Sequence, residues 1–369
     1  MPELYIGLMS GTSLDGVDGV LADFSVPPLR VIGHVSMPFS AELKSELLAL
    51  NTSGTDELHR AALAANALVA VYAQVVAGLL DGSGTTAAQV SAIGAHGQTV
   101  RHRPGEFDGC GYTLQINNAA LLAERTGIDV VADFRSRDLA AGGQGAPLVP
   151  AFHAGMFGRP GHAVNVLNLG GISNLSVLPA DGSVAGFDCG PGNSLMDHWC
   201  REHTGREFDA EGRWAASGTV DRRLLAALLD EPYFRLPPPK STGRDLFNPA
   251  WLAARLQSFS ATAAVDVQAT LAEFTAASCA ADVIAHGQAG KTLIVCGGGA
   301  LNTHLMSRLQ AALPGMAVGS SQAHGLPPLQ VEAAAFAWLA RKCLQREPAG
   351  LPSVTGAAGA RVLGAVYPR

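Results

Sequence analysis

The feature that most constrains the fold is an order of segments that occurs twice along the chain. In the first half, an apolar segment over 4–9 leads through a turn rich in glycine, serine and threonine at 10–16 to a second apolar segment, 17–22. In the second half, an apolar segment over 163–169 leads in the same way into a glycine turn at 170–174. Short apolar runs bounded by such turns are typical of β-strands. The sequence therefore predicts two similar halves, each opening on a strand hairpin.

Each half continues with helices and further strands. We expect further strands at 29–37, 90–95, 129–132, 175–178, 184–187 and 292–296, and helices at 41–50, 56–82, 258–287 and 302–312. This duplicated order predicts an α/β fold of two lobes, with mixed β-sheets flanked by helices. We place the lobes at 1–140 and 141–369, with the seam in the glycine run 142–147. We also expect the C-terminal helix to pack back on the first lobe.

Composition and charge exclude several classes of protein. Of the 369 residues 48% are hydrophobic and 15% are charged, which is too apolar for a disordered chain. The 25 Lys and Arg against 31 Asp and Glu give a net charge of −6 without a basic run, so we expect neither a nucleic-acid nor a membrane partner. The 6 cysteines form no C-x-x-C pair, which argues against a disulfide framework and a zinc ribbon. The first residues lack the pattern of a signal peptide and predict a cytoplasmic protein.

One uncharged stretch, 61–80, has the length of a membrane span. It is mostly alanine and valine, contains Asn66, Gln74 and Gly78, and has neither an aromatic belt nor a basic flank. A buried, alanine-rich helix of a globular protein is the better interpretation.

Three short segments resemble known motifs but differ from them in position, residues or spacing. Residues 285–292 resemble a phosphate-binding loop but precede a strand instead of following one. Residues 297–302 lack the third glycine and the later acidic residue of a dinucleotide fingerprint. The acidic, histidine and cysteine side chains within 197–203 do not have the spacing of a zinc site.

Three glycine-rich turns, at 10–16, 170–174 and 297–299, each directly follow an apolar strand. Such turns can point backbone N–H groups at phosphate oxygens. A single one would be interpreted as a tight hairpin, but three on a duplicated scaffold favour a nucleotide-phosphate site. Asp15 and Asp18 flank the first turn, and a carboxylate there could bind a hydrated Mg²⁺ ion attached to the phosphates.

Asp188 is the candidate for an acid or base. It follows the predicted strand 184–187 and precedes a Gly-Pro-Gly turn, with a helix beginning near Ser194. Catalytic acids often stand at such strand ends. The alternative is an aspartate that only accepts hydrogen bonds from the N–H groups of the turn, and local sequence leaves both interpretations open.

Seven motifs, in their order along the chain, resemble those of the anhydro-N-acetylmuramic acid kinase family. They lie at 7–18, 96–99, 133–135, 142–150, 168–174, 188–193 and 240–244. The resemblance runs from end to end. That family belongs to the superfamily of actin, heat-shock chaperones and sugar kinases. The resemblance therefore implies two duplicated ribonuclease-H-like lobes in an actin-like ATPase fold with a central cleft.

The resemblance also implies an activity. ATP, with Mg²⁺, would phosphorylate O6 of 1,6-anhydro-N-acetylmuramic acid while water opens the anhydro bridge at C1. The products would be ADP and N-acetylmuramic acid 6-phosphate, in the recycling of cell-wall peptidoglycan. We expect a homodimer that acts on this small molecule.

The resemblance also implies residue roles. Asp188 would be the base that activates water, and Asp15 would hold Mg²⁺ through water. The first group of ATP contacts would be Gly11, Thr12, Ser13, Leu14, Asp15, Gly16, Val17 and Asp18. The second would be Gly170, Gly171, Gly297, Gly298 and Gly299. Gln98, Arg135 and Glu332 would contact the sugar.

Other classes of protein remain alternatives, because a fold does not decide a function. A kinase for another hexose or amino sugar would share the lobes and the phosphate turns. So would a non-catalytic, chaperone-like or actin-like ATP-driven clamp, although it would need a peptide-binding domain or a polymer interface. A carbamoyl-transfer relative would need an H-x-x-x-H pair, and the 11 histidines form none.

Overall fold

The computed structural model describes the whole chain except residues 1–2, 12–13 and 244–245. Thr12 and Ser13 of the predicted ATP loop therefore lie outside the described residues.

The chain divides into two compact units. Unit 1 is Met1–Met156 together with Leu329–Arg369, and unit 2 is Phe157–Pro328. These bounds differ from the predicted lobes, 1–140 and 141–369. The chain returns to unit 1 after residue 328, where a helix packs against its sheet. The first bound differs because residues 141–156 also belong to unit 1.

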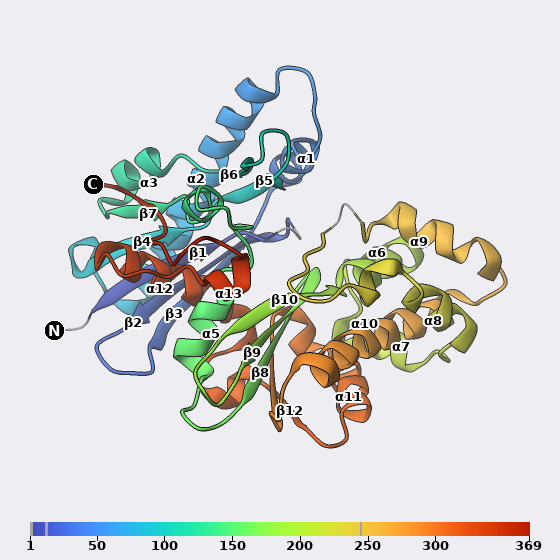
Figure 1. The fold of residues 1–369 in the computed structure, drawn as a ribbon. Coiled ribbons are helices and arrows are strands. Elements are labelled where there is room, and N and C mark those ends of the chain that lie inside the picture. The colour runs from blue at the N-terminus through green and yellow to red at the C-terminus, as the bar shows by residue number, and fades with distance from the viewer. Residues whose placement is uncertain (1–2, 12–13, 244–245) are drawn as a thin grey trace. The chain divides into compact units, whose positions relative to one another are not determined.

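Unit 1 is built on a six-stranded mixed sheet with the strand order β13-β7-β4-β1-β2-β3 (Figure 1). The strand β1 pairs antiparallel with β2 and parallel with β4, which in turn pairs parallel with β7. The strands of this sheet are β1 (Leu4–Met9), β2 (Gly16–Asp23), β3 (Arg30–Pro38), β4 (Val90–Ala95), β7 (Val130–Ala132) and β13 (Ala365–Tyr367). A separate hairpin consists of β5 (Gln98–Pro104) and β6 (Gly111–Ile116).

Helices cover both faces of this sheet. Leu4, Ile6 and Leu8 alternate along β1 and join one hydrophobic core with α2 (Glu57–Ser83), whereas Tyr5 joins the other core with α12 (Val331–Leu344). This alternation is the period of two that a strand buried on both faces requires. The remaining helices of unit 1 are α1 (Ala41–Ala49), α3 (Ala119–Thr126), α4 (Ser136–Leu139), α5 (Val149–Phe157) and α13 (Pro352–Thr355).

The helix α12 approaches the sheet at backbone contact. A Cβ atom added to Gly7 of β1 would lie 1.8 Å from the carbonyl oxygen of Ala333, and one added to Gly94 of β4 would lie 2.0 Å from that of Phe336. Only glycine has no Cβ, so these two residues allow the C-terminal segment to complete unit 1.

Unit 2 repeats the plan of unit 1. Its five-stranded sheet has the order β10-β9-β8-β11-β12, with β8 antiparallel to β9, β9 antiparallel to β10, and β8 parallel to β11. The same relations link β1, β2, β3 and β4 of unit 1. Each unit thus has the strand topology of a ribonuclease-H-like lobe, which confirms the predicted duplication.

The elements of unit 2 match the predicted positions in part. Its strands are β8 (Val164–Leu169), β9 (Ile172–Leu178), β10 (Ala185–Pro191), β11 (Thr292–Cys296) and β12 (Ala317–Ser320). Its helices are α6 (Ser194–Thr204), α7 (Arg213–Ala216), α8 (Arg222–Leu229), α9 (Pro249–Leu256), α10 (Ala264–His286) and α11 (Thr303–Ala312). Of these, β8, β11 and α11 lie close to the predicted positions, β9 and β10 are longer than predicted, and β12, α7, α8 and α9 were not predicted. The helix α10 contributes much of the hydrophobic core.

The long apolar stretch 61–80 lies in α2. Among the described residues, this is the one helix long and apolar enough to cross a membrane. Leu68, Tyr72 and Val76 are buried in the hydrophobic core beside the strands. This packing agrees with the predicted core helix.

The glycine run 142–147 lies inside unit 1 and not at a seam between units. The backbone N–H of Gly145 donates to Oδ2 of Asp138 at 2.8 Å, and that of Gln144 donates to the carbonyl oxygen of Thr355 at 2.8 Å. These contacts anchor the run to two other segments of unit 1, so a seam there was a wrong expectation.

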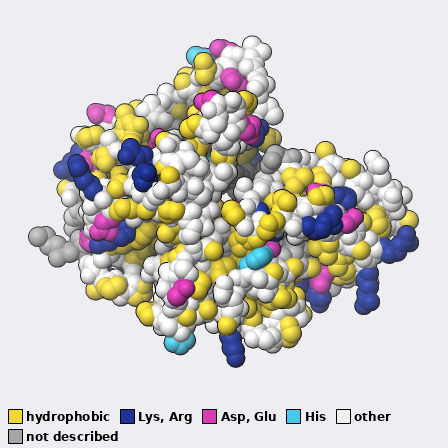
Figure 2. Space-filling model, in the orientation of Figure 1, with side chains coloured by type: hydrophobic (Ala, Val, Ile, Leu, Met, Phe, Trp, Pro, Cys, Tyr) yellow, Lys and Arg dark blue, Asp and Glu magenta, His cyan; other side chains and the backbone are white. Residues whose placement is uncertain are grey.

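Lys and Arg side chains on the face drawn in Figure 2 are spread among acidic and apolar side chains. They do not gather into a single basic surface on that face, as far as the described residues show.

We expect Gly7→Ala to lower the free energy of unfolding by about 1–3 kcal/mol or more, because the added methyl group must push α12 off the sheet. Gly82→Ala is the matched control. Gly82 lies in α2 with nothing within 4 Å of an added Cβ, so alanine should raise the free energy by about 0.5–1 kcal/mol. Denaturant unfolding measures both. Equal effects of the two substitutions would contradict the close packing of α12 on β1.

Candidate active site

In unit 1 the candidate site begins where β1 and β4 end. The two strands are parallel, so the turn after Met9 and the segment after Ala95 leave the sheet at the same edge. The side-chain amide of Gln98 donates to the carbonyl oxygen of Gly11 at 3.1 Å. Ser10 Oγ donates to the carbonyl oxygen of Gly97 at 3.1 Å. The start of the predicted phosphate turn is therefore fixed to the 96–98 segment.

A buried tyrosine supports this junction from below. Tyr72 of α2 is fully buried, and its hydroxyl lies 3.0 Å from Ser10 Oγ and accepts the N–H of Gly97 at 3.1 Å. Burial raises the pKa of the Tyr72 phenol to about 12, so it stays protonated and can donate. The sequence analysis did not single out Tyr72, because nothing local connects a tyrosine in a helix with a turn 62 residues earlier.

The first turn itself is narrow. The N–H of Leu14 donates to the carbonyl oxygen of Gly11 at 3.2 Å, and Leu14 has a left-handed backbone, with φ of 59°. Gly16, Val17 and Asp18 belong to β2. Since the Val17 side chain is buried in the core, only its backbone can face a ligand.

The two carboxylates that flank the first turn face solvent to different degrees. Asp15 is exposed, and the Lys44 ammonium lies 3.3 Å from its Oδ1 atom. Asp18 lies 3.3 Å from Nε2 of His34. The described residues hold no group of three or more metal-ligating side chains. An exposed carboxylate such as Asp15 suits an ion that keeps most of its water and is held mainly by phosphates.

Arg135 joins the same edge of unit 1. It follows β7, which runs parallel to β4, and its Nη2 atom lies 2.9 Å from Nε2 of His96. Its Nη1 atom donates to the carbonyl oxygen of Gly145 at 2.7 Å. Burial, together with the guanidinium of Arg135, lowers the pKa of His96 to about 3. His96 is therefore neutral and can accept the arginine's hydrogen bond.

Glu332 stands in the first turn of α12. This helix runs antiparallel to β1, since Arg341 pairs with Glu3 while Ala333 lies against Gly7. The first turn of α12 therefore points towards the carboxyl end of β1. The three predicted sugar residues, Gln98, Arg135 and Glu332, thus lie at one edge of unit 1.

In unit 2 the register of the sheet brings the predicted residues into one row. Asp188 pairs with Asn174, Asn174 with Asn168, and Asn168 with Cys296. Since neighbouring strands lie about 4.8 Å apart, Asp188 and Asn168 are about 10 Å apart. Gly297 directly follows Cys296 of this row, and Gly170 stands two residues after Asn168. The two glycine turns and Asp188 therefore share an edge of unit 2.

The glycine turns of unit 2 are in mutual contact. The N–H of Asn193 donates to the carbonyl oxygen of Gly170 at 2.7 Å, and its side-chain amide donates to that of Leu169 at 3.0 Å. Gly297 has a φ of 78°, and a Cβ atom there would lie 2.5 Å from Oδ1 of Asn168. Only a residue without a side chain fits this position. Gly298, by contrast, is exposed and can meet a ligand.

The sequence had predicted Asp188 at the end of a strand. In the structure it lies within β10. The strand continues to Pro191 through an irregularity between Asp188 and Gly190. The Asp188 carboxylate accepts the N–H of Thr242 at 3.0 Å through Oδ2. Its carbonyl oxygen accepts the hydroxyl of Tyr233 at 2.6 Å. Both the backbone and the side chain of Asp188 are thus held in place.

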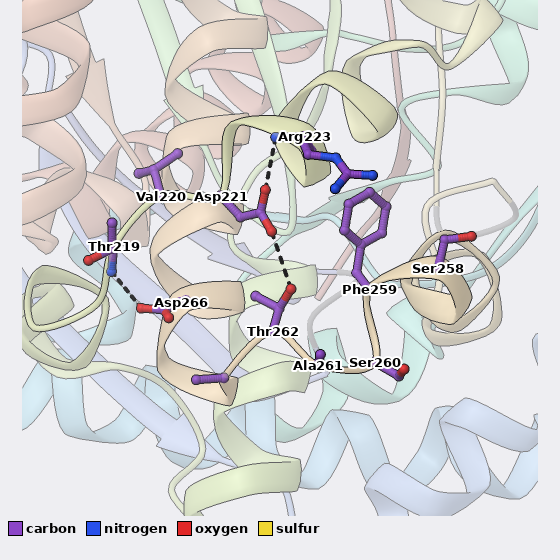
Figure 3. A pocket seen from close by; sticks show the side chains of 11 residues that line it. Thr219, Val220, Asp221, Arg223, Ser258, Phe259, Ser260, Ala261, Thr262 and Asp266 are labelled. Carbon is purple, nitrogen blue, oxygen red and sulfur yellow. Dashed lines mark hydrogen bonds between the residues drawn. The ribbon is translucent and has the colours of Figure 1, made fainter.

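A cavity of about 540 Å³ in unit 2 contains none of the predicted site residues (Figure 3). Asp221 caps α8, accepting the N–H of Arg223 at 2.8 Å, and its other oxygen accepts the Thr262 hydroxyl at 3.2 Å. Asp266 accepts the N–H of Thr219 at 2.7 Å. The carboxylates that line this cavity serve the local fold.

Comparison with known proteins connects this geometry to a family. The model of the family described as anhydro-N-acetylmuramic acid kinase matches residues 3–369. The chain is 68% identical to a protein of that name from Variovorax paradoxus, over 99% of both chains. It is 65% identical to one from Albidiferax ferrireducens, over 100% of both chains.

Solved structures of other proteins are more distant. The activator of the 2-hydroxyisocaproyl-CoA dehydratase from Clostridium difficile matches with a TM-score of 0.48 and 9% identity, over 90% of this chain and 92% of that one. A ROK family glucokinase from Streptomyces griseus matches with a TM-score of 0.43 and 15% identity, over 92% and 99%. At such scores these structures add nothing to the topology described above.

A family match over nearly the whole chain, on duplicated lobes with glycine turns, defines a sugar kinase. Within this class, the chain belongs to the anhydro-N-acetylmuramic acid kinase family.

The neutral state of His96 generates a prediction about acid stability. Its pKa is about 3 in the folded protein and about 6.5 when unfolded. The unfolded chain therefore binds more protons between these values, and the free energy of unfolding should fall as the pH drops below 6.5. This residue contributes at most about 1.4 kcal/mol per pH unit.

We expect His96→Asn to make this decline shallower in urea titrations between pH 6.5 and 4. His162→Asn, at an exposed histidine, is the control and should leave the slope unchanged. An unchanged slope in His96→Asn would show that His96 is not held neutral.

Proposed function

We propose that this protein uses ATP to phosphorylate O6 of 1,6-anhydro-N-acetylmuramic acid while water opens the anhydro bridge, giving N-acetylmuramic acid 6-phosphate and ADP. The observation that carries the proposal is the row in unit 2 that sets Asp188 beside two glycine turns. The turns suit the phosphates, and the carboxylate suits proton removal from water or from a sugar hydroxyl. The family match over residues 3–369 supports the choice of substrate.

The roles are assigned within each unit separately. In unit 1 the turn that begins at Gly11 would bind phosphate oxygens, and Gln98, Arg135 and Glu332 would contact the sugar. In unit 2 the turns at 170–171 and 297–299 would bind the nucleotide. Backbone N–H groups at glycine turns recognise phosphates in this way without a cluster of basic side chains, which agrees with the net charge of −6.

The chemical step would couple two bond cleavages. The Asp188 carboxylate takes a proton from water as the water oxygen bonds to C1. The bond between C1 and O6 breaks, and O6 takes the γ-phosphoryl group as ADP leaves. Mg²⁺, held through water by Asp15, would neutralise phosphate charge when bound. The hydrogen bond from the Thr242 N–H to Oδ2 holds the Asp188 carboxylate in one orientation.

The homodimer remains a prediction, as does the cytoplasmic location, which was predicted from the first residues of the chain. Phosphorylation of another hexose or amino sugar is the alternative activity. In that reaction the carboxylate would take the proton of a sugar hydroxyl instead of a proton of water, and no anhydro bridge would open. Incubation with ATP and either the anhydro sugar or glucose, followed by analysis of the sugar phosphate, separates the two activities.

We expect Asp188→Asn to lower kcat by about 10²–10⁴, because the amide keeps the shape and the acceptor oxygen but cannot take a proton. KM for ATP should change little. Asp181→Asn is the control, since Asp181 is an exposed aspartate in the turn before β10 that bonds only to Ser183 among the contacts described. Near-normal turnover by a folded Asp188→Asn protein would remove Asp188 from the mechanism.

A further inference from the structure

A short segment of unit 2, residues 240–242, holds Asp188 at two points. The carbonyl oxygen of Lys240 accepts the N–H of Asp188 at 3.1 Å, and the N–H of Thr242 donates to Asp188 Oδ2 at 3.0 Å. The orientation of the carboxylate therefore depends on where this segment lies. The segment belongs to no helix or strand, so something other than a backbone ladder must fix it.

The side chain of Lys240 supplies that anchor. Its ammonium lies 3.0 Å from Oδ1 of Asp282, and the two side chains are 2% and 10% exposed. Asp282 belongs to the long helix α10, which forms much of the core of unit 2. The ammonium also lies 5.1 Å from the ring centre of Tyr233 and 5.7 Å from that of Phe187, the residue before Asp188. The ion pair thus fixes the segment to a rigid helix directly behind Asp188.

Stability alone does not account for such a pair. Removing two charges from water costs several kcal/mol per ion, and well-packed apolar residues in the same place are often neutral or stabilising. Burial raises the pKa of Asp282, which shows the cost that the Lys240 ammonium has to offset. Buried charges that break the rule for a core are most often found where a function needs a fixed geometry.

We propose that the buried Lys240–Asp282 ion pair positions the catalytic carboxylate of Asp188, by holding the 240–242 segment so that the Thr242 N–H orients Oδ2. This inference rests on the proposed function of Asp188 as the base. Lys240 and Asp282 are positioning residues, because neither needs to touch the substrate. The pair acts through backbone contacts, so its loss changes turnover more than binding.

The titratable groups around this cluster determine what a pH profile reports. They are Tyr233, Cys189, Lys240, Asp282 and His286. Burial raises the pKa values of Tyr233 and Cys189, which keeps both neutral over the working range. The Thr242 N–H donates to the carboxylate of Asp188, so loss of that hydrogen bond should move the acid limb of the kcat profile to higher pH.

The test is the double variant Lys240→Met with Asp282→Leu, which removes both charges and leaves no unpaired ion. We expect it to fold, to keep KM for ATP within about threefold, and to lose about tenfold or more in kcat. The acid limb of its kcat profile should move to higher pH. Wild-type kcat with an unmoved acid limb would overturn the positioning role.

The matched control is Arg308→Gln with Glu273→Gln. That pair also ties α10 to a neighbouring segment, with Nη2 and Oε1 3.1 Å apart, but it makes none of the contacts to Asp188 described here. Its kcat and acid limb should match wild type, and an equal loss in this control would overturn the proposal.

If the double variant does not fold, the single variant Lys240→Met carries the test, because a buried Asp282 can become neutral by binding a proton. The same loss of kcat is then expected, and wild-type turnover overturns the proposal.

Asp188→Asn, measured in the same series, separates the two claims. Normal turnover by Asp188→Asn overturns the assignment of the base, and the positioning proposal with it. A loss in Asp188→Asn together with normal kinetics in the double variant overturns the positioning proposal alone.

Discussion

Parallel pairing of the central strands is the constraint on which the rest of each unit depends. In unit 1 it aligns β1 with β4, and in unit 2 it aligns β8 with β11. Because parallel strands end at the same edge of a sheet, the segments that follow them must meet there. The two glycine turns of unit 2 therefore touch, and in unit 1 Gln98 reaches the carbonyl oxygen of Gly11. Closely packed glycines make the meeting possible, since a side chain at Gly297 would collide with Asn168.

Much of the fold could be predicted because its signals are local. The apolar runs and glycine turns at 4–16 and 163–174 were sufficient to predict the first strands of both units and their shared order. The first unit bound differs from the predicted one because the glycine run 142–147 is hydrogen-bonded to Asp138 and to Thr355, and the contact with Thr355 joins residues that are distant in sequence. The β5–β6 hairpin was also missed, since polar residues interrupt its strands.

The candidate site divides in the same way. Asp188 and the glycine turns belong to motifs that can be recognised in the sequence. The residues that hold these groups in place belong to no recognisable motif. Tyr72 supports the first turn from a helix, and Asp282 anchors Lys240 from another helix. Neither has a local pattern that distinguishes it from an ordinary core or surface residue. The sequence therefore predicts the groups that would react, and the structure adds the groups that orient them.

In the proposed reaction, one event both opens the anhydro bridge and transfers the phosphoryl group. The most direct test is turnover of the anhydro sugar and ATP in ¹⁸O-labelled water, with mass spectrometry of the sugar phosphate and of inorganic phosphate. Unlabelled product incubated in the same water corrects for exchange of the free C1 hydroxyl. We expect one label at C1 of the sugar and none in its phosphate. An unlabelled sugar phosphate with its bridge intact, or label in inorganic phosphate alone, would contradict the account.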